Sequence, residues 1–505
     1  MHRLIILFVF TILGIIPFYG QTNKTTYSKN DSLIFKEIFN LALTQGHAYP
    51  RLGELCKTIG ARLSGSDAAE KGVNWAYQML KSYQFDRVDT QGVMVPRWER
   101  GNNGELLLKS ELLQKILASK DGKKELAHKV VKLAYPLSPA SDFECESFLK
   151  SDFKNTEWIS LPAVALGGSV GGKYTAKVVS INNKKALDSL GQLGLLKNKF
   201  VLLNRPMDET QISTFNAYGS CVNQRVQGAD WCSPYGALAV LVRSVSNRCD
   251  LHPHTGVTGY GKNINPIPMI AVATAAADLL HYLSLNDPNS TISIDFNCQM
   301  LPDRQSANVI AQTNGQLYPN KIIVFGGHFD SWDQGEGAHD DGAGCMHAFE
   351  ALRLLKAIGY TPKHTLRCVF WMNEENGVRG GNEYARVADA KKELHIAALE
   401  SDRGGFSPRG FGLDSTLYQA ALKYLPLLEQ YQISALEHGG GGVDISPLKK
   451  VFSNIEFAGL HPDSQRYFDV HHAETDVFEN VNKRELELGA AAVAVMIYII
   501  DQSLD

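Results

Sequence analysis

The sequence has little net charge and contains no low-complexity segment or internal repeat. Its 50 Lys and Arg residues nearly balance its 53 Asp and Glu residues, leaving a formal net charge of −3 over 505 residues. This balance gives no electrostatic reason to expect a nucleic acid or an anionic membrane as a partner. A hydrophobic share of 44% and a charged share of 20% are typical of a folded globular protein. The length is too great for one ordinary core, so two domains are expected.

The sequence also lacks an apolar run long enough for a comfortable membrane-spanning helix. The N-terminal run follows Arg3 and breaks at Pro17, which is the form of a secretory signal peptide, and we assign it to residues 1–21. No cysteine lies at the expected cleavage point, which argues against a lipoprotein anchor. We therefore expect a secreted or periplasmic protein with no stable membrane anchor. The other run, LGAAAVAVMIYII at residues 488–500, predicts a helix packed on the core.

Cysteine is infrequent, with eight residues in the chain. Export would permit disulfide bonds. Cys221 and Cys232 flank a short polar segment and could form a bridge. Cys345 and Cys368 lie within apolar segments, which predicts buried free thiols.

The pattern of apolar residues changes twice along the chain. Residues 31–85 carry apolar residues at helical spacing, with Ser64 or Ser66 as a helix N-cap. Residues 156–298 instead contain short β-like runs separated by turns, which predict a β-rich insert: AVAL, AKVVSI, KFVLLN, LAVLVRSV, IPMIAVA and TISIDF. After Pro302, strands alternate with helices, which is the pattern of a mostly parallel sheet covered on both faces.

The sequence therefore predicts an α/β fold whose main domain is discontinuous. Residues 22–155 and 299–505 are assigned to a mostly parallel mixed sheet covered by helices, and residues 156–298 to the insert. Residues 110–155, which look helical and then irregular, are taken as an extra segment of the main domain.

Acidic and imidazole side chains recur where the predicted strands of the main domain end. The stretch KIIVFGGHFDSWDQGEGAHDDG at residues 321–342 is an apolar strand followed by a glycine-rich loop. The carboxyl ends of parallel strands meet at one edge of a sheet, where ligands bind. We therefore expect the following groups to converge there: His328 and Asp330, Asp340 and Asp341, Glu374 and Glu375, Asp402, and the pair His471–His472.

These residue types favour a catalytic metal site. Imidazole and carboxylate ligands without cysteine suit a zinc pair better than a structural zinc. Two such ions polarise a carbonyl and lower the pKa of a bridging water. The Asp340 carboxylate could bridge two cations, because its glycine-rich loop permits close approach. Asp402 ends an apolar strand, where a bare carboxylate would be costly without a cation or hydrogen bonds.

The remaining acidic residues of the site have more than one interpretation. Asp330 could hold the second ring nitrogen of His328. Asp341 could be a further ligand or the cap of the following helix. Of Glu374 and Glu375, one could bind metal while the other, desolvated and with a raised pKa, acts as a general base.

The chain resembles the co-catalytic dizinc aminopeptidase and exopeptidase family. The similarity covers most of the chain outside residues 1–21 and 110–155, and its motifs are GGHFDSWDQGEGAHDDGAG, HTLRCVFWMNEENG, LESDRGGFSPRG, RYFDVHHAETD and MVPRWERG. The resemblance implies the zinc exopeptidase fold with a protease-associated-like insert. It also implies two Zn²⁺ ions per chain and a homodimer.

The resemblance assigns a role to each candidate residue of the site. It implies that one zinc is held by His328, Asp340 and Asp402, and the other by Asp340, Glu375 and His472, with Asp340 bridging. Glu374 would be the general base, and Asp330 would orient His328. A cis peptide bond between Asp340 and Asp341 is a further expectation.

The expected function is that of a secreted dizinc metallo-exopeptidase acting on dipeptides or short peptides. A zinc-bridging hydroxide would attack the peptide carbonyl after Glu374 has taken its proton. An aminopeptidase acting on longer peptides is an alternative. Two non-hydrolytic alternatives are a glutaminyl-cyclase-like transferase and a receptor-type binding protein, which zinc content would separate from the dizinc enzyme.

Two further features have open interpretations. Arg403, next to Asp402, could form a structural ion pair or contact a carboxylate of the substrate. The glycine-rich segment at residues 438–442 could be an active-site loop or merely a flexible one.

Overall fold

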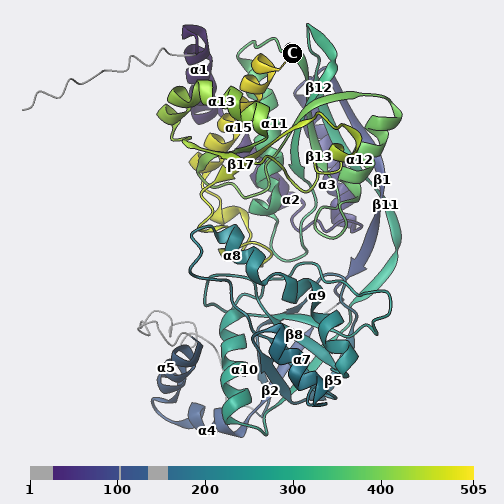
Figure 1. Ribbon diagram of the computed structural model, residues 1–505, viewed down its shortest axis with the longest axis vertical. Helices are drawn as coiled ribbons and strands as arrows, with labels where there is room; N and C mark the ends of the chain where they lie inside the picture. The colour runs from purple at the N-terminus through teal and green to yellow at the C-terminus, as the bar shows by residue number, and fades with distance from the viewer. Residues whose placement is uncertain (1–26, 102–103, 135–156, 505) are drawn as a thin grey trace, which may run out of the picture.

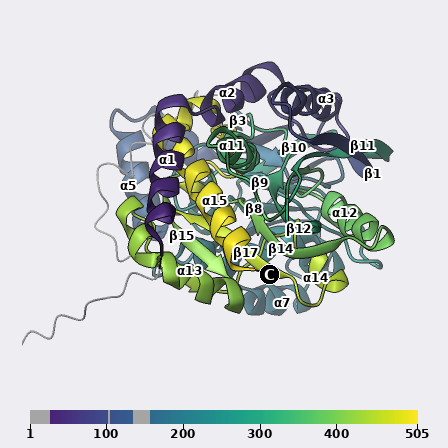
Figure 2. The same cartoon turned by 90° about the horizontal axis from the view of Figure 1, so that it is seen from above.

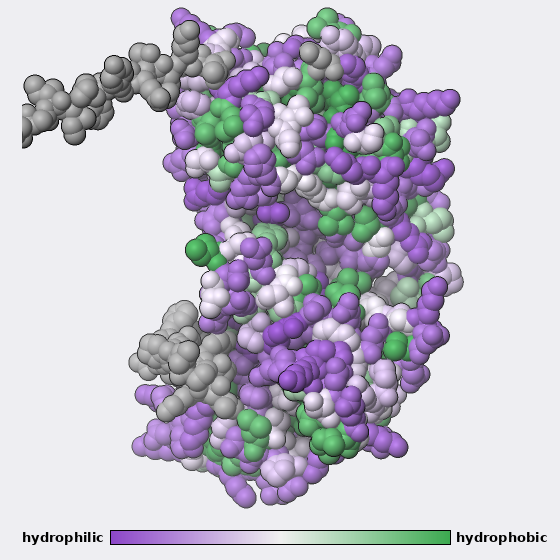
Figure 3. All heavy atoms as spheres, in the orientation of Figure 1, coloured by the Kyte–Doolittle hydropathy of each residue, from purple (hydrophilic) through white to green (hydrophobic). Residues whose placement is uncertain are grey.

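The computed structural model describes residues 27–101, 104–134 and 157–504. The expected signal peptide therefore lies outside the described residues. The chain forms two bodies, one above the other in Figure 1. We call the body built on the largest sheet the main body, and we call residues 105–134 and 157–298 the insert. The surface is hollowed at the junction of the two bodies (Figure 3).

The main body is built on an eight-stranded mixed sheet. Its central strands β13, β12, β14 and β17 are parallel, and antiparallel strands lie toward both edges. Every residue of β13 is buried, as expected for a strand covered on both faces. The predicted mixed α/β sheet is therefore confirmed. In sheet order the strands are β1 (Arg87–Glu99), β11 (Gln299–Thr313), β13 (His364–Trp371), β12 (Tyr318–His328), β14 (Leu394–Glu400), β17 (Glu456–Pro462), β15 (Pro408–Leu413) and β16 (Ala435–His438).

Helices cover this sheet, and most residues of α11 and α15 are buried. The Ser66 side chain accepts a hydrogen bond from the backbone N–H of Ala69 and caps α3. Of the two predicted N-cap residues, Ser64 and Ser66, the second is therefore confirmed. Figure 2 shows α15 beside α1 and α13. Among the described residues α15 alone is long and apolar enough to cross a membrane, but 83% of its most apolar stretch of 18 residues is buried in the protein. The predicted C-terminal core helix is thus confirmed. The helices are α1 (Lys29–Gln45), α2 (Ala48–Thr58), α3 (Asp67–Ser82), α11 (Ala343–Ala357), α12 (Arg379–Ala390), α13 (Ser415–Leu428), α14 (Leu448–Val451) and α15 (Lys483–Ser503).

The insert contains two smaller sheets and several helices. The four-stranded sheet has the order β3 (Ile159–Ser160), β2 (Glu105–Lys109), β10 (Thr291–Phe296) and β5 (Gly172–Ala176). The five-stranded sheet has the order β4 (Ala163–Ala165), β9 (Met269–Val272), β8 (Ala239–Arg243), β7 (Phe200–Leu203) and β6 (Val178–Ile181). All six β-like runs predicted between residues 156 and 298 contain one of these strands. Helices α4 (Glu111–Ala118), α5 (Gly122–Ala134), α7 (Lys184–Gln192), α8 (Thr214–Cys221), α9 (Asn223–Cys232) and α10 (Thr274–Asn286) accompany the sheets.

Residues 105–134 pack with the insert and not with the main sheet. The sequence analysis placed them in the main domain, but β2 pairs with β10 and with β3. Leu113 of α4 and Leu126 of α5 are buried in the same apolar cluster as the strands of the insert. Residues 135–156, the rest of the expected extra segment, lie outside the described residues.

The predicted bridge between Cys221 and Cys232 is wrong, because both are free and buried. The segment between them is not a loop but helix α9, whose ten residues span roughly 15 Å. The two side chains also belong to different apolar clusters. Cys345 and Cys368 are buried free thiols, as predicted.

The two bodies are connected by backbone and by polar contacts. Strands β1 and β11 pair along their length and form a ribbon that runs from the main sheet to the insert (Figure 1). Arg100, at the end of this ribbon, pairs with Asp333 of the main body and donates a 3.3 Å hydrogen bond to the Thr255 hydroxyl of the insert. The backbone N–H of Thr255, in the insert, donates a 2.9 Å hydrogen bond to the carbonyl oxygen of His472. The insert is therefore anchored directly to the segment that carries the expected imidazole ligands.

Candidate active site

The expected site residues converge at the carboxyl ends of three adjacent parallel strands. Strand β12 ends at His328, Glu374 and Glu375 follow β13, and Asp402 follows β14. Asp340 arrives on the loop after β12. The loop before α15 brings His472 to the same place, where a cavity of about 600 Å³ opens between the two bodies. This is the edge at which open α/β sheets bind their ligands.

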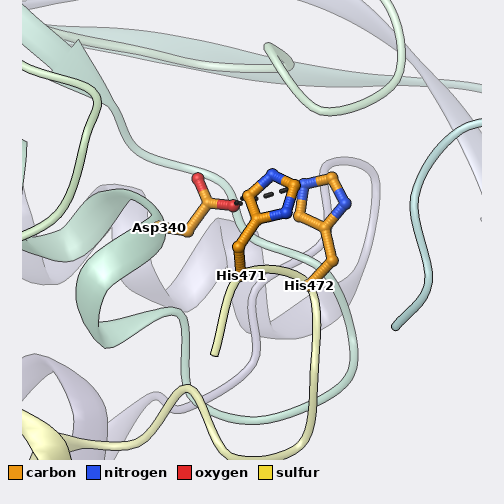
Figure 4. Close-up of side chains that lie close together, drawn as sticks. All are labelled: Asp340, His471 and His472. Atoms are coloured by element: carbon orange, nitrogen blue, oxygen red, sulfur yellow. Dashed lines mark ion pairs between the residues drawn. The ribbon is translucent and has the colours of Figure 1, made fainter. Parts of the chain in front are cut away.

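Asp340 lies between two imidazoles. Its Oδ1 is 3.1 Å from Nε2 of His328, and its Oδ2 is 3.2 Å from Nε2 of His472. The two oxygens of one carboxylate therefore face two different imidazoles, which is the arrangement that a bridging ligand requires. Figure 4 shows Asp340 beside His471 and His472, with both rings directed at its carboxylate.

A further carboxylate accompanies each imidazole. Oδ1 of Asp402 is 3.6 Å from Nε2 of His328, and Oε2 of Glu375 is 3.1 Å from Nε2 of His472. The structure thus brings together the two sets expected from the sequence, which share Asp340. The ligand atoms of His328, Asp340 and Glu375 also lie within 4.8 Å of one another.

The charges at this site fit bound cations. Burial raises the pKa of Glu375 to about 7, with the Asp340 charge adding to this effect. Burial lowers the pKa of His472, but the adjacent Glu375 and Asp340 carboxylates outweigh it and raise the pKa to about 9. Oδ2 of Asp340 and Oε1 of Glu375 are buried without a well-directed hydrogen bond. Buried carboxylates need a compensating charge, and this set of imidazole and carboxylate donors without sulfur fits zinc.

The carboxylate of Asp330 was expected to hold His328. It does not, because its Oδ1 lies 3.9 Å from Nδ1 of His328. Its backbone carbonyl oxygen lies 2.9 Å from Nδ1 of His328 and accepts the hydrogen bond. The Asp330 carboxylate instead accepts hydrogen bonds from the backbone N–H groups of Asn373 and Glu374, at 2.7 and 3.0 Å. Asp330 therefore positions both a ligand and the expected base.

Asp341 is held by the backbone on both oxygens. It accepts 3.0 Å hydrogen bonds from the N–H groups of His328 and Gly344. Of its two interpretations, the contacts favour the cap of α11, with the added function of tying the end of β12 to that helix. The peptide bond between Asp340 and Asp341 is cis, as the family resemblance implied.

Two residues that the sequence analysis missed hold the loop carrying Asp340. The Asp476 carboxylate accepts hydrogen bonds from the N–H groups of His339 and Asp340, at 2.7 and 3.1 Å. The buried Arg62 donates to the carbonyl oxygens of Glu336 and Gly337, at 2.7 and 2.9 Å. Asp476 comes four residues after His472, and an acidic residue so close to a ligand was the available signal.

The insert forms one wall of the cavity, with Phe215, Tyr218, Arg225 and Val257 lining it. Arg225 donates a 2.7 Å hydrogen bond to the Tyr218 hydroxyl, and its Nη1 lies 3.4 Å from Nδ1 of His472. These residues were missed because they lie more than 200 positions before His472 and form no motif with it. The sequence gives no signal for such a contact.

Glu374 lines the same cavity. Burial raises the pKa of its carboxyl well above the usual range, and the neighbouring Asp402 and Glu375 carboxylates reinforce this shift while His328 opposes it. Glu374 is anchored through its backbone N–H, and its carboxyl group has a raised pKa and lines the cavity. Such a group is suited to proton transfer.

The glycine-rich segment borders a second, smaller cavity together with Arg403. A side chain at Gly440 would collide with the carbonyl of Phe457, and one at Gly442 with the carboxylate of Glu400. Glu400 accepts hydrogen bonds from the N–H groups of Val443 and Ile445 at 2.8 and 3.0 Å. The segment is thus a cavity-lining loop in close contact with the strand that leads to Asp402.

Comparisons with known proteins agree with this geometry. Residues 308–497 match the model of peptidase family M28. Over 475 residues the chain is 28% identical to carboxypeptidase Q of Mus musculus, an alignment covering 92% of this chain and 89% of that protein.

Solved structures show the same fold. A peptidase M28 precursor from Shewanella amazonensis SB2B superposes with a TM-score of 0.79 at 26% identity, covering 94% of this chain and 97% of that one. BSAP, a zinc aminopeptidase from Bacillus subtilis, has a TM-score of 0.58 at 16% identity, with 90% and 93% covered, and shares the fold. The chain is therefore a zinc peptidase similar to carboxypeptidase Q, and its residues 308–497 carry the match to peptidase family M28.

Proposed function

We propose that this protein is an exported dizinc exopeptidase that hydrolyses dipeptides or short peptides. The observation that carries the proposal is the Asp340 carboxylate between two imidazole–carboxylate sets, with Glu374 lining the same cavity. A cavity of about 600 Å³ is in the range of small-molecule sites. That size and its lining by both bodies favour a short substrate over the middle of a long chain.

The residues of the site divide the work between holding and proton transfer. His328, Asp340 and Asp402 hold one zinc, and Asp340, Glu375 and His472 hold the other. When bound, the two ions polarise the scissile carbonyl and the attacking water. Glu374 takes a proton from that water and passes it to the leaving amine nitrogen.

Neighbouring groups keep Glu374 in place for these transfers. The Asp330 carboxylate fixes its backbone N–H, and burial raises the pKa of its carboxyl group. The 3.0 Å bond from Glu374 to Asp330 and the contact of Asp330 with His328 couple the base to the ligand set.

The test replaces the two adjacent glutamates separately. Glu374→Gln should lower kcat on a dipeptide by about 10²- to 10⁴-fold while zinc content, measured by mass spectrometry, stays that of the wild type. Glu375→Gln, the matched control, should lose zinc as well as activity. Retained hydrolysis in the Glu374→Gln variant would rule out the base assignment. Release of free amino acids by the wild type, measured by chromatography, separates hydrolysis from a cyclising transfer, which would release ammonia or water instead.

A further inference from the structure

A smaller cavity adjoins the main one beside Asp402, and the proposed chemistry does not use it. This second cavity, of about 220 Å³, is lined by Arg403, Gly441, Gly442 and Leu460 among others. It shares Phe215, Asp402 and Val443 with the main cavity. The two spaces are therefore adjacent, and Arg403 lines the smaller one.

Arg403 is half-buried and has no acceptor for its N–H groups. Its guanidinium lies 4.5 Å from the ring centroid of Phe215, which belongs to α8 of the insert. Within the described residues no oxygen accepts a hydrogen bond from this side chain and no carboxylate pairs with it. The carboxylate of Glu437, one of the acidic groups near Arg403, lies 3.3 Å from His461. The structural ion pair considered for Arg403 is thus absent from this part of the chain.

Several other enclosed arginines of the described chain have a carboxylate partner. Arg243 pairs with Asp278, Arg353 with Glu350, and Arg367 with Glu393. In the main cavity Arg225 already donates to the Tyr218 hydroxyl. The five N–H donors of a guanidinium match a carboxylate in a bidentate geometry.

The site needs such a cation if its substrate carries a carboxylate. Asp340, Glu374, Glu375 and Asp402 line the main cavity, and bound zinc would neutralise their charge. A substrate carboxylate that enters the site can then be held by a further fixed positive charge beside the metal site. Among the residues that line the two cavities, Arg225 and Arg403 carry such a charge, and the donors of Arg403 are free.

We propose that Arg403 binds a free carboxylate of the peptide substrate and makes this enzyme selective for dipeptides over longer or amidated peptides. The inference rests on the proposed exopeptidase function. Phe215 holds the guanidinium plane by stacking, so the insert takes part in this selection. Because Arg403 follows the ligand Asp402 directly, the carboxylate that it binds belongs to a residue next to the scissile bond.

The experiment uses three substrates and two variants of the full-length zinc-loaded enzyme. Ala-Leu offers an α-carboxylate, Ala-Leu amide offers none, and Ala-Glu amide offers only a side-chain carboxylate. Arg403→Gln should lower kcat/KM on Ala-Leu by about 10- to 100-fold, mainly through KM, and leave Ala-Leu amide nearly unchanged. Arg403→Lys should recover part of the loss, because it keeps the charge without the planar fork.

The arms of the experiment separate the alternatives. A loss on Ala-Glu amide rather than on Ala-Leu would identify a side-chain carboxylate as the group bound. An equal loss on all three substrates, or no loss on any, overturns the assignment of Arg403 while the peptidase function stands. Arg409→Gln, which changes an exposed arginine paired with Asp463, is the matched control and should behave as wild type.

Zinc content distinguishes the two levels of failure. If the wild type holds zinc and cleaves none of the three substrates, the proposed exopeptidase function itself fails. If Arg403→Gln loses zinc together with activity on Ala-Leu amide, Arg403 supports Asp402 instead of reading the substrate, and the inference is overturned.

Discussion

The active site of the main body and the buried ion pair of the insert treat charge in opposite ways. In the insert, Arg243 and Asp278 form an ion pair whose side chains are each 4% exposed. In the main body, the carboxylates of the site outnumber the imidazoles that face them, and some of their oxygens lack a well-directed hydrogen bond. The Arg243–Asp278 pair is neutral by itself, whereas the active site of the main body retains a negative surplus that bound cations would neutralise.

The two bodies also contribute different kinds of residues to the cavity. All expected ligands and the expected base come from the main body, at strand ends and in the adjoining loops. The insert contributes aromatic rings and an arginine, Phe215, Tyr218 and Arg225. This division separates chemistry from recognition, and each side of it can be tested by substitution.

The largest effect is expected from the residue that joins the two ligand sets. Asp340→Asn keeps the size of the side chain but removes the charge shared by both sets, so both zinc ions should be lost. The value of kcat/KM should fall by more than about 10³-fold, and mass spectrometry should find less than one zinc per chain. Asp303→Asn, which removes an exposed carboxylate paired with Arg379, is the control. A variant that keeps wild-type zinc content would contradict the bridging role.

The buried pair of the insert should govern stability without affecting chemistry. Arg243→Met leaves Asp278 charged and unpaired in the interior, which should lower the free energy of unfolding by about 3–5 kcal/mol. Zinc content and kcat of the folded protein should match the wild type. The double variant Arg243→Met with Asp278→Leu should recover most of the loss, as denaturant titration can show. Loss of zinc from the Arg243→Met variant would mean that a change in the buried pair of the insert also disturbs the metal site of the main body.

Zinc removal should make the stability of the main body depend strongly on pH. Without metal, Glu375 has a folded pKa of about 7 against an ordinary 4.5, and His472 one of about 9 against 6.5. Both folded pKa values are raised, so the folded state binds the extra protons and stability falls as pH rises from about 5 to 9. The melting temperature of the zinc-free enzyme should therefore fall over this range.

The zinc-loaded enzyme should lose less stability over the same pH range, because its ligands are already deprotonated. If the melting temperatures of the two forms fell equally with rising pH, the metal would not be compensating the surplus of carboxylates. Calorimetry at several pH values makes this measurement.

The order of strand ends in the sequence predicted where the site lies, and the family resemblance implied which residues are its ligands. His328, Asp340, Glu375, Asp402 and His472 are separated by over a hundred residues, yet parallel topology brings the end of each strand to one edge. The part played by the Asp330 carboxylate could not be predicted. It depends on how the chain turns after β12, which places the carboxylate 3.9 Å from the imidazole and against the backbone of Glu374.

Contacts between the bodies were beyond the sequence for a different reason. The ten residues of α9 show no apolar stripe or motif that would point Arg225 at His472. Only the docking of the insert on the loop before α15 creates that contact. The free state of Cys221 and Cys232 depends likewise on α9, because a helix between them keeps the thiols apart.

The smallest effect is expected at the wall that the insert provides. Phe215→Ala removes the ring that stacks on Arg403, a contact worth about 0.5–2 kcal/mol. The KM for a dipeptide should rise about 3- to 10-fold, with kcat and zinc content unchanged. Tyr174→Ala, on an exposed aromatic residue of β5 that is 40% accessible, should leave KM unaltered. The Phe215 ring contacts Arg403 and none of the expected ligands. A fall in kcat with unchanged KM would therefore show that the insert affects the chemical step itself, and that chemistry and recognition are not divided between the two bodies.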